Sequence, residues 1–575
     1  MELGIYAVLG ITVIVAVAAF SKRLGVAAPI ILVVVGVVLS YLPGVPLIEV
    51  PHEWVLDGLL PPILYAAAIR VPVVDFRRNL GEIASLSVVL VVVTAFGTGF
   101  VLYSVLPDLN LAAAIALGAV ISPPDAVAAT SIGRRLGLPP RLLTVLEGEG
   151  LVNDATALVL LRSATAAAAG GLLSPWDTVV DFVLAVALGL VVGLAVGWAT
   201  VFVRSKLEDP VLDTAVSIAV PFVAFLPAEG LNASGVLAVV VAGLYTGHHS
   251  QSRFSAQARI SDRINWRTIQ FLLENGVFLL IGIEIRTLVD HVDPEVLGVG
   301  DSIAIGLLAT ACLVVLRFLW MGPLVFVIER RARHAERAAL RDWLALHHYF
   351  RTPSTGHWQA RRRRRLRHLY QRRRSDLEHL RRQHIDWRGG IVLSWSGMRG
   401  VVTLAAAQSL PESTPYRSQL VLIAFTVAVV TLVVQGGTLP ALIRLLGIEG
   451  ANVHEDQRDL ARLLDEISYA GLEVLEDPAA AIDSDEEIDP EVVDRVRQSS
   501  FLRAEAAWER TRGTDVSPSE APHRAYRQLR LAVVLAERES LLDARSRGAY
   551  PSRVLASAQA LLDLEETRLR SARTG

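Results

Sequence analysis

The chain has 575 residues, of which 52% are hydrophobic, and its mean hydropathy of +0.45 excludes an ordinary soluble protein. Its net charge of −2 favours no class of charged partner, and its single cysteine, Cys312, excludes a disulfide framework. Residues 329–388 and 447–575 are highly charged, whereas residues 1–328 and 389–446 are apolar segments joined by short loops. We therefore expect a membrane domain in two parts, interrupted by a basic insertion and followed by a soluble tail.

Thirteen stretches are long and apolar enough to cross a bilayer as helices, which takes about 20 residues each. The predicted spans lie at residues 3–20, 26–43, 54–70, 83–106, 111–132, 142–168, 177–203, 211–228, 231–247, 266–288, 299–328, 389–410 and 417–446. The first span follows Glu2 rather than a basic segment, so we expect a retained helix and not a signal peptide. The predicted fold class is an all-α polytopic membrane protein with a helical tail.

Basic residues concentrate in the loops after odd-numbered spans, and the loops after even-numbered spans carry almost none. The basic loops contain Lys22 and Arg23; Arg70, Arg77 and Arg78; Arg134, Arg135 and Arg141; Arg204 and Lys206; Arg253, Arg259 and Arg263; and the insertion. Arg286 and Arg417 are the exceptions. Basic loops stay in the cytoplasm, so we expect a plasma-membrane protein with its N-terminus outside and its insertion and tail inside.

The span at 111–132 is interrupted by the sequence "SPPD" at residues 122–125. Pro123 and Pro124 each remove a helix N–H, and broken helix at membrane depth is tolerated where it is buried in protein or lines a wet cavity. Asp125 follows the break, where the positive end of a half-helix stabilises a carboxylate. These features favour an ion site; a structural proline kink capped by Asp125 is the alternative.

The next span contains "EGEGLVNDATALVLL", residues 147–161, with three carboxylates in an apolar setting. Ionisable groups at membrane depth cost about 2.5–3.5 kcal/mol each on insertion scales, so they persist mainly where they pair or line a cavity. Glu149 and Asn153 share a helix face, whereas Asp154 lies about 100° beyond Asn153. Asp154 is therefore expected to face a lumen while Glu149 packs against a neighbour; an acid buried in a polar core is the alternative for Asp154.

The insertion at 329–388 contains eighteen arginines and no lysine. Nucleic-acid binding is conceivable for such a segment. We favour attraction to an anionic lipid leaflet, worth about 1 kcal/mol per basic residue, and expect no nucleic-acid partner. Apolar side chains recur at helical spacing and predict an amphipathic helix on the membrane surface: Leu366, Leu369, Tyr370, Leu377, Leu380 and His384.

The span at 389–410 contains Arg399, flanked by Gly397 and Gly400, which predicts a second weak or broken helix. A membrane-buried arginine needs a carboxylate partner. Glu149 is the first candidate and Asp125 the second. The tail from about residue 450 shows four helical patterns separated by breaks, which predict a small soluble bundle.

The two broken spans occupy corresponding places if spans one to six are matched with spans eight to thirteen. Seven crossings precede span eight, so it starts on the opposite side of the membrane from span one, and the two halves are inverted. Paired broken helices in inverted halves point to a secondary transporter with a site near the midplane. A cation channel is the distant alternative, although no pore-lining repeat is evident. A membrane enzyme is disfavoured because no nucleophile–base pair, phosphate loop or His/Cys cluster lies in the spans, and no cofactor is expected.

Five stretches resemble, in order, motifs of NhaP-type cation/proton antiporters, whose animal relatives are the sodium/hydrogen exchangers. They are "LPPILYAAAIR" at 60–70, "SPPDAVAAT" at 122–130, "EGEGLVNDATALV" at 147–159, "ASGVLAVVVAGLYTG" at 233–247 and "GMRGVVTLAAA" at 397–407. The resemblance covers about residues 1–446 and implies a thirteen-helix fold with a dimerisation domain and a mobile core domain, and hence a homodimer. It also implies that Asn153 and Asp154 form the ion site, that Asp125 assists, and that Glu149 pairs with Arg399.

The chain departs from the motifs of this antiporter family at three positions. Gly150 stands where the signature has serine, Pro124 where many members have threonine or a small residue, and Ala66 where several relatives have glutamate. These replacements leave fewer side-chain oxygens for a cation. Backbone carbonyls at the 122–125 break and water are therefore expected to complete the ligand set.

The chemistry of these residues predicts exchange. Sodium is a hard cation that prefers oxygen ligands, and the candidates are Asp154 and Asp125, the Asn153 amide oxygen, and the hydroxyls of Ser122 or Thr130. Asp154 can hold either a proton or a cation, and alternating access converts that competition into antiport. We expect Na+, or Li+ in its place, to exchange for H+, with K+/H+ antiport as the alternative; electroneutrality is implied by the resemblance alone.

Overall fold

The computed structural model describes residues 2–24, 27–43, 51–168, 175–351 and 385–448, together with a few short stretches of the tail. The chain divides into two compact units, 1–450 and 451–575. In the described part of the second unit, Arg530 forms an ion pair with Glu565, with contacts of 2.7 and 3.0 Å. The predicted amphipathic helix of the insertion and most of the predicted tail bundle lie outside the described residues.

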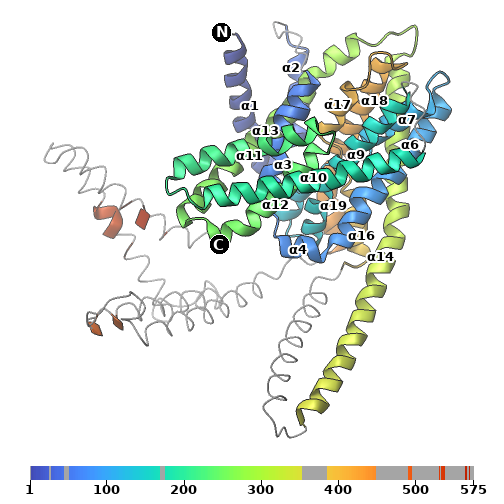
Figure 1. Cartoon of the computed structure of the whole chain (residues 1–575). Coiled ribbons are helices and arrows are strands. Elements are labelled where there is room, and N and C mark those ends of the chain that lie inside the picture. Colours follow the sequence, from blue (N-terminus) through green and yellow to red (C-terminus); the bar gives the residue numbers. More distant parts are fainter. Residues whose placement is uncertain are drawn as a thin grey trace, which may run out of the picture. The chain divides into compact units, whose positions relative to one another are not determined.

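The described part of the first unit is helical throughout (Figure 1). Its first half comprises α1 (Glu2–Leu24), α2 (Ala28–Ser40), η1 (Trp54–Leu59), α3 (Leu60–Ala68), α4 (Val73–Arg78), α5 (Leu80–Ala84), η2 (Ser85–Leu90), α6 (Val91–Val105), α7 (Leu111–Ile121), α8 (Ala126–Arg135) and α9 (Pro140–Ala168). Its second half comprises α10 (Pro175–Arg204), α11 (Pro210–Gly230), α12 (Gly235–Arg253), α13 (Ala256–Asp290), α14 (Val299–Arg351), α16 (Trp387–Trp395), α17 (Val401–Gln408), α18 (Arg417–Val430), η3 (Thr431–Gln435) and α19 (Gly436–Leu446).

The predicted all-α polytopic membrane fold is confirmed. Each predicted span coincides with a helix or a run of consecutive helices, and seven helical segments in the described residues are long and apolar enough to cross a membrane. Shorter apolar helices lie at 8–21, 28–40 and 54–68. The inverted relation of the two halves stays a prediction.

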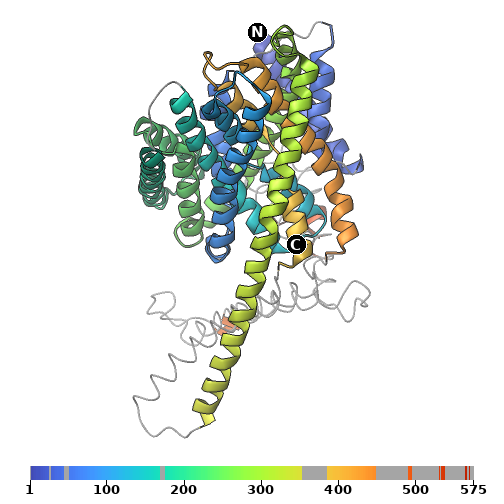
Figure 2. The ribbon, with the colours of Figure 1, turned by 90° about the vertical axis from the view of Figure 1, so that its right-hand side faces the viewer.

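The helix α14 is longer than the sequence pattern indicates. The predicted span ends at residue 328, whereas the helix continues without interruption to Arg351 (Figure 2). The first part of the predicted insertion is therefore the end of this helix.

Two groups of helices form the membrane unit. One apolar cluster joins α6, α7, α9, α14 and α18, and another joins α3, α11 and α12. The helix α13 packs along α2, and two glycines allow the close approach. A Cβ atom at Gly36 would lie 2.5 Å from the Leu279 carbonyl oxygen, and a Cβ atom at Gly282 would lie 2.3 Å from the Val33 carbonyl oxygen.

The two predicted helix breaks are present. The helix α7 ends at Ile121 and α8 begins at Ala126, so that the two prolines lie in the gap. The helix α16 ends at Trp395 and α17 begins at Val401. The breaks touch each other, because the Asp125 backbone N–H donates to the Met398 carbonyl oxygen at 2.6 Å.

Candidate functional site

Asp125 lies where the two broken helices meet. Its carboxylate oxygen Oδ1 accepts a hydrogen bond of 2.8 Å from the Val127 backbone N–H, so Asp125 caps the positive end of α8. Gly400 lies directly opposite, and a Cβ there would be 2.2 Å from Asp125 Oδ2. Only glycine leaves room for the aspartate at this crossing.

Arg399 lies at the same crossing and binds backbone carbonyls. Its guanidinium donates to the Ile121 oxygen at 3.0 Å and the Ser122 oxygen at 3.3 Å, and also to the Gly397 oxygen. These carbonyls belong to the ends of α7 and α16, where a helix leaves acceptors unsatisfied and carries negative partial charge. Arg399 therefore neutralises the ends of the broken helices.

The predicted pair between Glu149 and Arg399 is wrong. Glu149 instead pairs with Arg317 of α14 through two charge-assisted hydrogen bonds of 2.6 and 2.8 Å, and both side chains are buried. Arg317 also donates to the Leu393 carbonyl at 3.1 Å, which ties the pair to α16. Arg317 is the single basic residue within the predicted span 299–328. That position alone could have identified Arg317 as a candidate partner for Glu149.

The helix α9 directs its polar residues to different neighbours. Asn153 donates from its amide nitrogen to the Pro124 carbonyl oxygen at 2.6 Å, and its amide oxygen is buried without a hydrogen-bond partner. The Asn153 side chain therefore stabilises the break between α7 and α8. Asp154 lies further round the helix and lines a cavity, away from the buried pair of Glu149.

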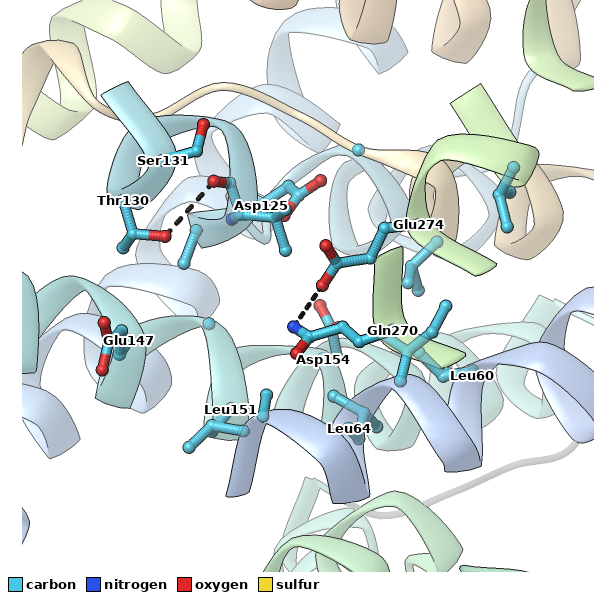
Figure 3. Close-up of a pocket in the computed structure, with 18 of the residues that line it drawn as sticks. Leu60, Leu64, Asp125, Thr130, Ser131, Glu147, Leu151, Asp154, Gln270 and Glu274 are labelled. Atoms are coloured by element: carbon cyan, nitrogen blue, oxygen red, sulfur yellow. Dashed lines mark hydrogen bonds between the residues drawn. The ribbon is translucent and has the colours of Figure 1, made fainter. Parts of the chain in front are cut away.

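That cavity has a volume of about 390 Å³ and lies between α3, α8, α9, α13 and α17. Asp154, Asp125 and Thr130 line it, and Figure 3 shows them around the same space. Asn153, Ser122, Glu149 and Arg399 are not among its lining residues. Ser122 donates instead to the Val91 carbonyl at 2.9 Å and contacts the Thr94 hydroxyl.

Sequence reasoning missed the residues that α13 contributes. Gln270 and Glu274 project from this helix into the cavity (Figure 3) and are joined by a hydrogen bond from the amide nitrogen to the carboxylate. Three arginines also line the cavity: Arg70, Arg134 and Arg267. Glu274 is an acid within the predicted apolar span 266–288, and this position in the sequence could have identified it as a candidate site residue.

A model of the sodium/hydrogen exchanger transmembrane region matches residues 9–445 of this chain. The chain belongs to the sodium/hydrogen exchanger family. An uncharacterised Na(+)/H(+) exchanger of Mycobacterium bovis is 29% identical over 98% of this chain and 96% of its own length. The Na(+)/H(+) antiporter ApNhaP of Aphanothece halophytica is 26% identical over 73% of this chain and 70% of its own length.

Two further proteins are similar to this chain. A sodium, potassium, lithium and rubidium/H(+) antiporter of Bacillus pumilus is 28% identical over 72% of this chain and 57% of its own length. The sodium proton antiporter MjNhaP1 of Methanocaldococcus jannaschii matches in structure with a TM-score of 0.54 and 16% identity, covering 78% of this chain and 100% of that one. The exchanger is thus a multi-pass membrane transporter with the antiporter fold, and not an enzyme.

Proposed function

We propose that this exchanger moves Na+, or Li+ in its place, against H+ across the plasma membrane, one for one, by alternating access. The observation that carries the proposal is the cavity in which Asp154 and Asp125 meet at the crossing of two broken helices. Broken helices at such a crossing offer charged ends and free carbonyls to an ion. The protein is proposed to act as a homodimer in the lipid bilayer, as the resemblance to NhaP-type antiporters implies.

The ligands available to a cation are oxygens. Asp154 offers its carboxylate, Asp125 offers Oδ2, which does not cap the helix, and Thr130 offers a hydroxyl oxygen whose proton is donated to the Val127 carbonyl. Asp154 binds either the proton or the cation, so one excludes the other. One such carboxylate per cycle supports exchange without net charge movement.

The cavity is open to one side of the membrane in this proposal. Arg70 and Arg134, which line it, come from loops that the charge pattern predicts to be cytoplasmic. At the opposite end Val55, Val277 and Ala405 form an apolar cluster. Beyond this cluster the Gln408 amide donates to Glu284 at 3.3 Å. We infer an inward-facing state in which these contacts close the outer path.

Potassium is the alternative cation, because a relative that exchanges sodium, potassium, lithium and rubidium for protons is similar to this chain. Gly150 and Pro124 also leave a sparse set of side-chain ligands, which favours a more hydrated ion.

A cation panel in proteoliposomes tests the proposal. A preset proton gradient is followed by a pH dye while Na+, Li+ or K+ is added, with potassium and valinomycin clamping the membrane potential in the Na+ and Li+ arms. We expect Na+ and Li+ to dissipate the gradient at a rate that does not depend on the clamped potential. A response to K+ but not Na+ would overturn the sodium assignment and leave antiport intact, whereas a leak that needs no cation would overturn both.

A further inference from the structure

Gln270 and Glu274 lie four residues apart on α13 and therefore share one face of the helix. The Gln270 amide nitrogen donates to Glu274 Oε1, while the Gln270 amide oxygen is buried without a hydrogen-bond partner. Glu274 forms no ion pair within the described residues. An unpaired carboxylate beside an unpartnered amide oxygen is a set of donors suited to a hard cation.

The charged side chains that line the cavity favour a cation beside Glu274. Arg70, Arg134 and Arg267 line the cavity, and of these only Arg134 forms an ion pair with a described residue, Glu147. The acids that line the cavity are Asp125, Glu147, Asp154 and Glu274, so the formal charges of the lining sum to −1 with Glu274 and to zero without it. Glu274 supplies the carboxylate that makes the balance of the lining negative, which attracts a cation.

Glu274 faces the cavity from a different helix than Asp154 does. The helix packs along α2 and α3, whereas α9, which carries Asp154, packs against α7 and α8. The wall of the cavity that α3 contributes is apolar, with Ile63, Leu64 and Ala67, and Arg70 lies in the turn after this helix. The polar residues of α13 that line the cavity are Arg267, Gln270 and Glu274, and of these Gln270 and Glu274 lie nearest the middle of the helix.

We propose that Gln270 and Glu274 form a second subsite for the transported monovalent cation. This subsite rests on the proposed exchange function. A partly dehydrated cation binds there first, between the Glu274 carboxylate and the Gln270 amide oxygen, and passes from there to Asp154. Glu274 thereby sets the apparent affinity for the cation, while Asp154 couples the cation to the proton.

Cation titration of transport by purified protein in proteoliposomes tests the subsite. Glu274→Gln keeps the shape and removes the charge, so the half-saturating Na+ concentration should rise about tenfold, equivalent to about 1.4 kcal/mol. Glu274→Asp should restore part of the affinity, and Gln270→Ala should raise the half-saturating concentration by a smaller factor. Glu295→Gln, which makes the same change at an exposed carboxylate after α13, should leave it unchanged.

The same preparations separate the outcomes. If wild-type protein shows no cation-dependent exchange, the proposed function fails. If wild-type protein exchanges and Glu274→Gln keeps a half-saturating concentration within twofold of it, the subsite is contradicted. If Glu274→Gln does not yield folded protein, Gln270→Ala decides, and an unchanged half-saturating concentration for that variant would contradict the subsite.

Discussion

Asp154 is the residue on which the proposed coupling depends most directly, because its carboxylate lines the cavity and can bind a proton or a cation. Asp154→Asn removes the titratable group and keeps the volume, so we expect exchange to fall to the background of empty vesicles while expression stays normal. The assay is dye-reported proton exchange in vesicles from an antiporter-deficient host. Asp301→Asn, at an exposed carboxylate, is the matched control. Normal exchange by Asp154→Asn would remove Asp154 from the site.

The buried pair of Glu149 and Arg317 predicts a stability effect. Arg317→Gln leaves the Glu149 charge unpaired in the interior, and losing one partner of such a pair costs roughly 3–5 kcal/mol. The double variant Glu149→Gln with Arg317→Gln should be milder than the sum of the two single variants. Thermal unfolding of the detergent-solubilised variants measures this, and additive losses of melting temperature would argue against the pair.

Arg317 and Arg399 show what residue-level sequence reasoning could not resolve. Both arginines lie in predicted spans, and the rule that a buried arginine needs a carboxylate led to Glu149 as the partner of Arg399. The structure satisfies Arg399 with three backbone carbonyls, which exist only because two helices are broken. Partners that come from the ends of helices cannot be identified by searching the sequence for acids.

At the scale of elements, the crossing of the two broken helices depends on Gly400. Its α-hydrogen faces Asp125, and a methyl group there would lie 2.2 Å from Asp125 Oδ2. Gly400→Ala should therefore push the breaks apart and lower exchange at least tenfold through displacement of Asp125. Gly437→Ala, where a methyl group meets nothing within 4 Å, is the matched control. Equal exchange rates for the two variants would contradict this role of the crossing.

The helices themselves were predictable because hydropathy and proline position are local signals. The breaks at 122–125 and around Arg399 follow from Pro123, Pro124 and the flanking glycines, and both are present. The contact between the two breaks and the contribution of α13 to the cavity are not local. Glu274 lies more than a hundred residues from Asp154 in the sequence, and only tertiary packing brings both to one cavity.

At the scale of the whole molecule, the proposed alternating access requires the contacts inferred to close the outer path to open and the cavity to close. Val277 of α13 and Ala405 of α17 pack together there, and Gln408 donates to Glu284 between the same two helices. The helices that carry Asp154 and Glu274 would then move relative to each other during the cycle. The coupling of this motion to ions rests on the competition at Asp154.

The proton and the cation are proposed to share Asp154, and the half-saturating Na+ concentration as a function of pH tests this competition. Uptake of isotopic Na+ into proteoliposomes is measured at a series of pH values, with the same pH on both sides at the start. We expect the half-saturating concentration to rise as the pH falls, approaching about tenfold per pH unit in the acidic range, while the maximal rate at high Na+ recovers. A half-saturating concentration that stays constant with pH, with only the maximal rate changing, would contradict it.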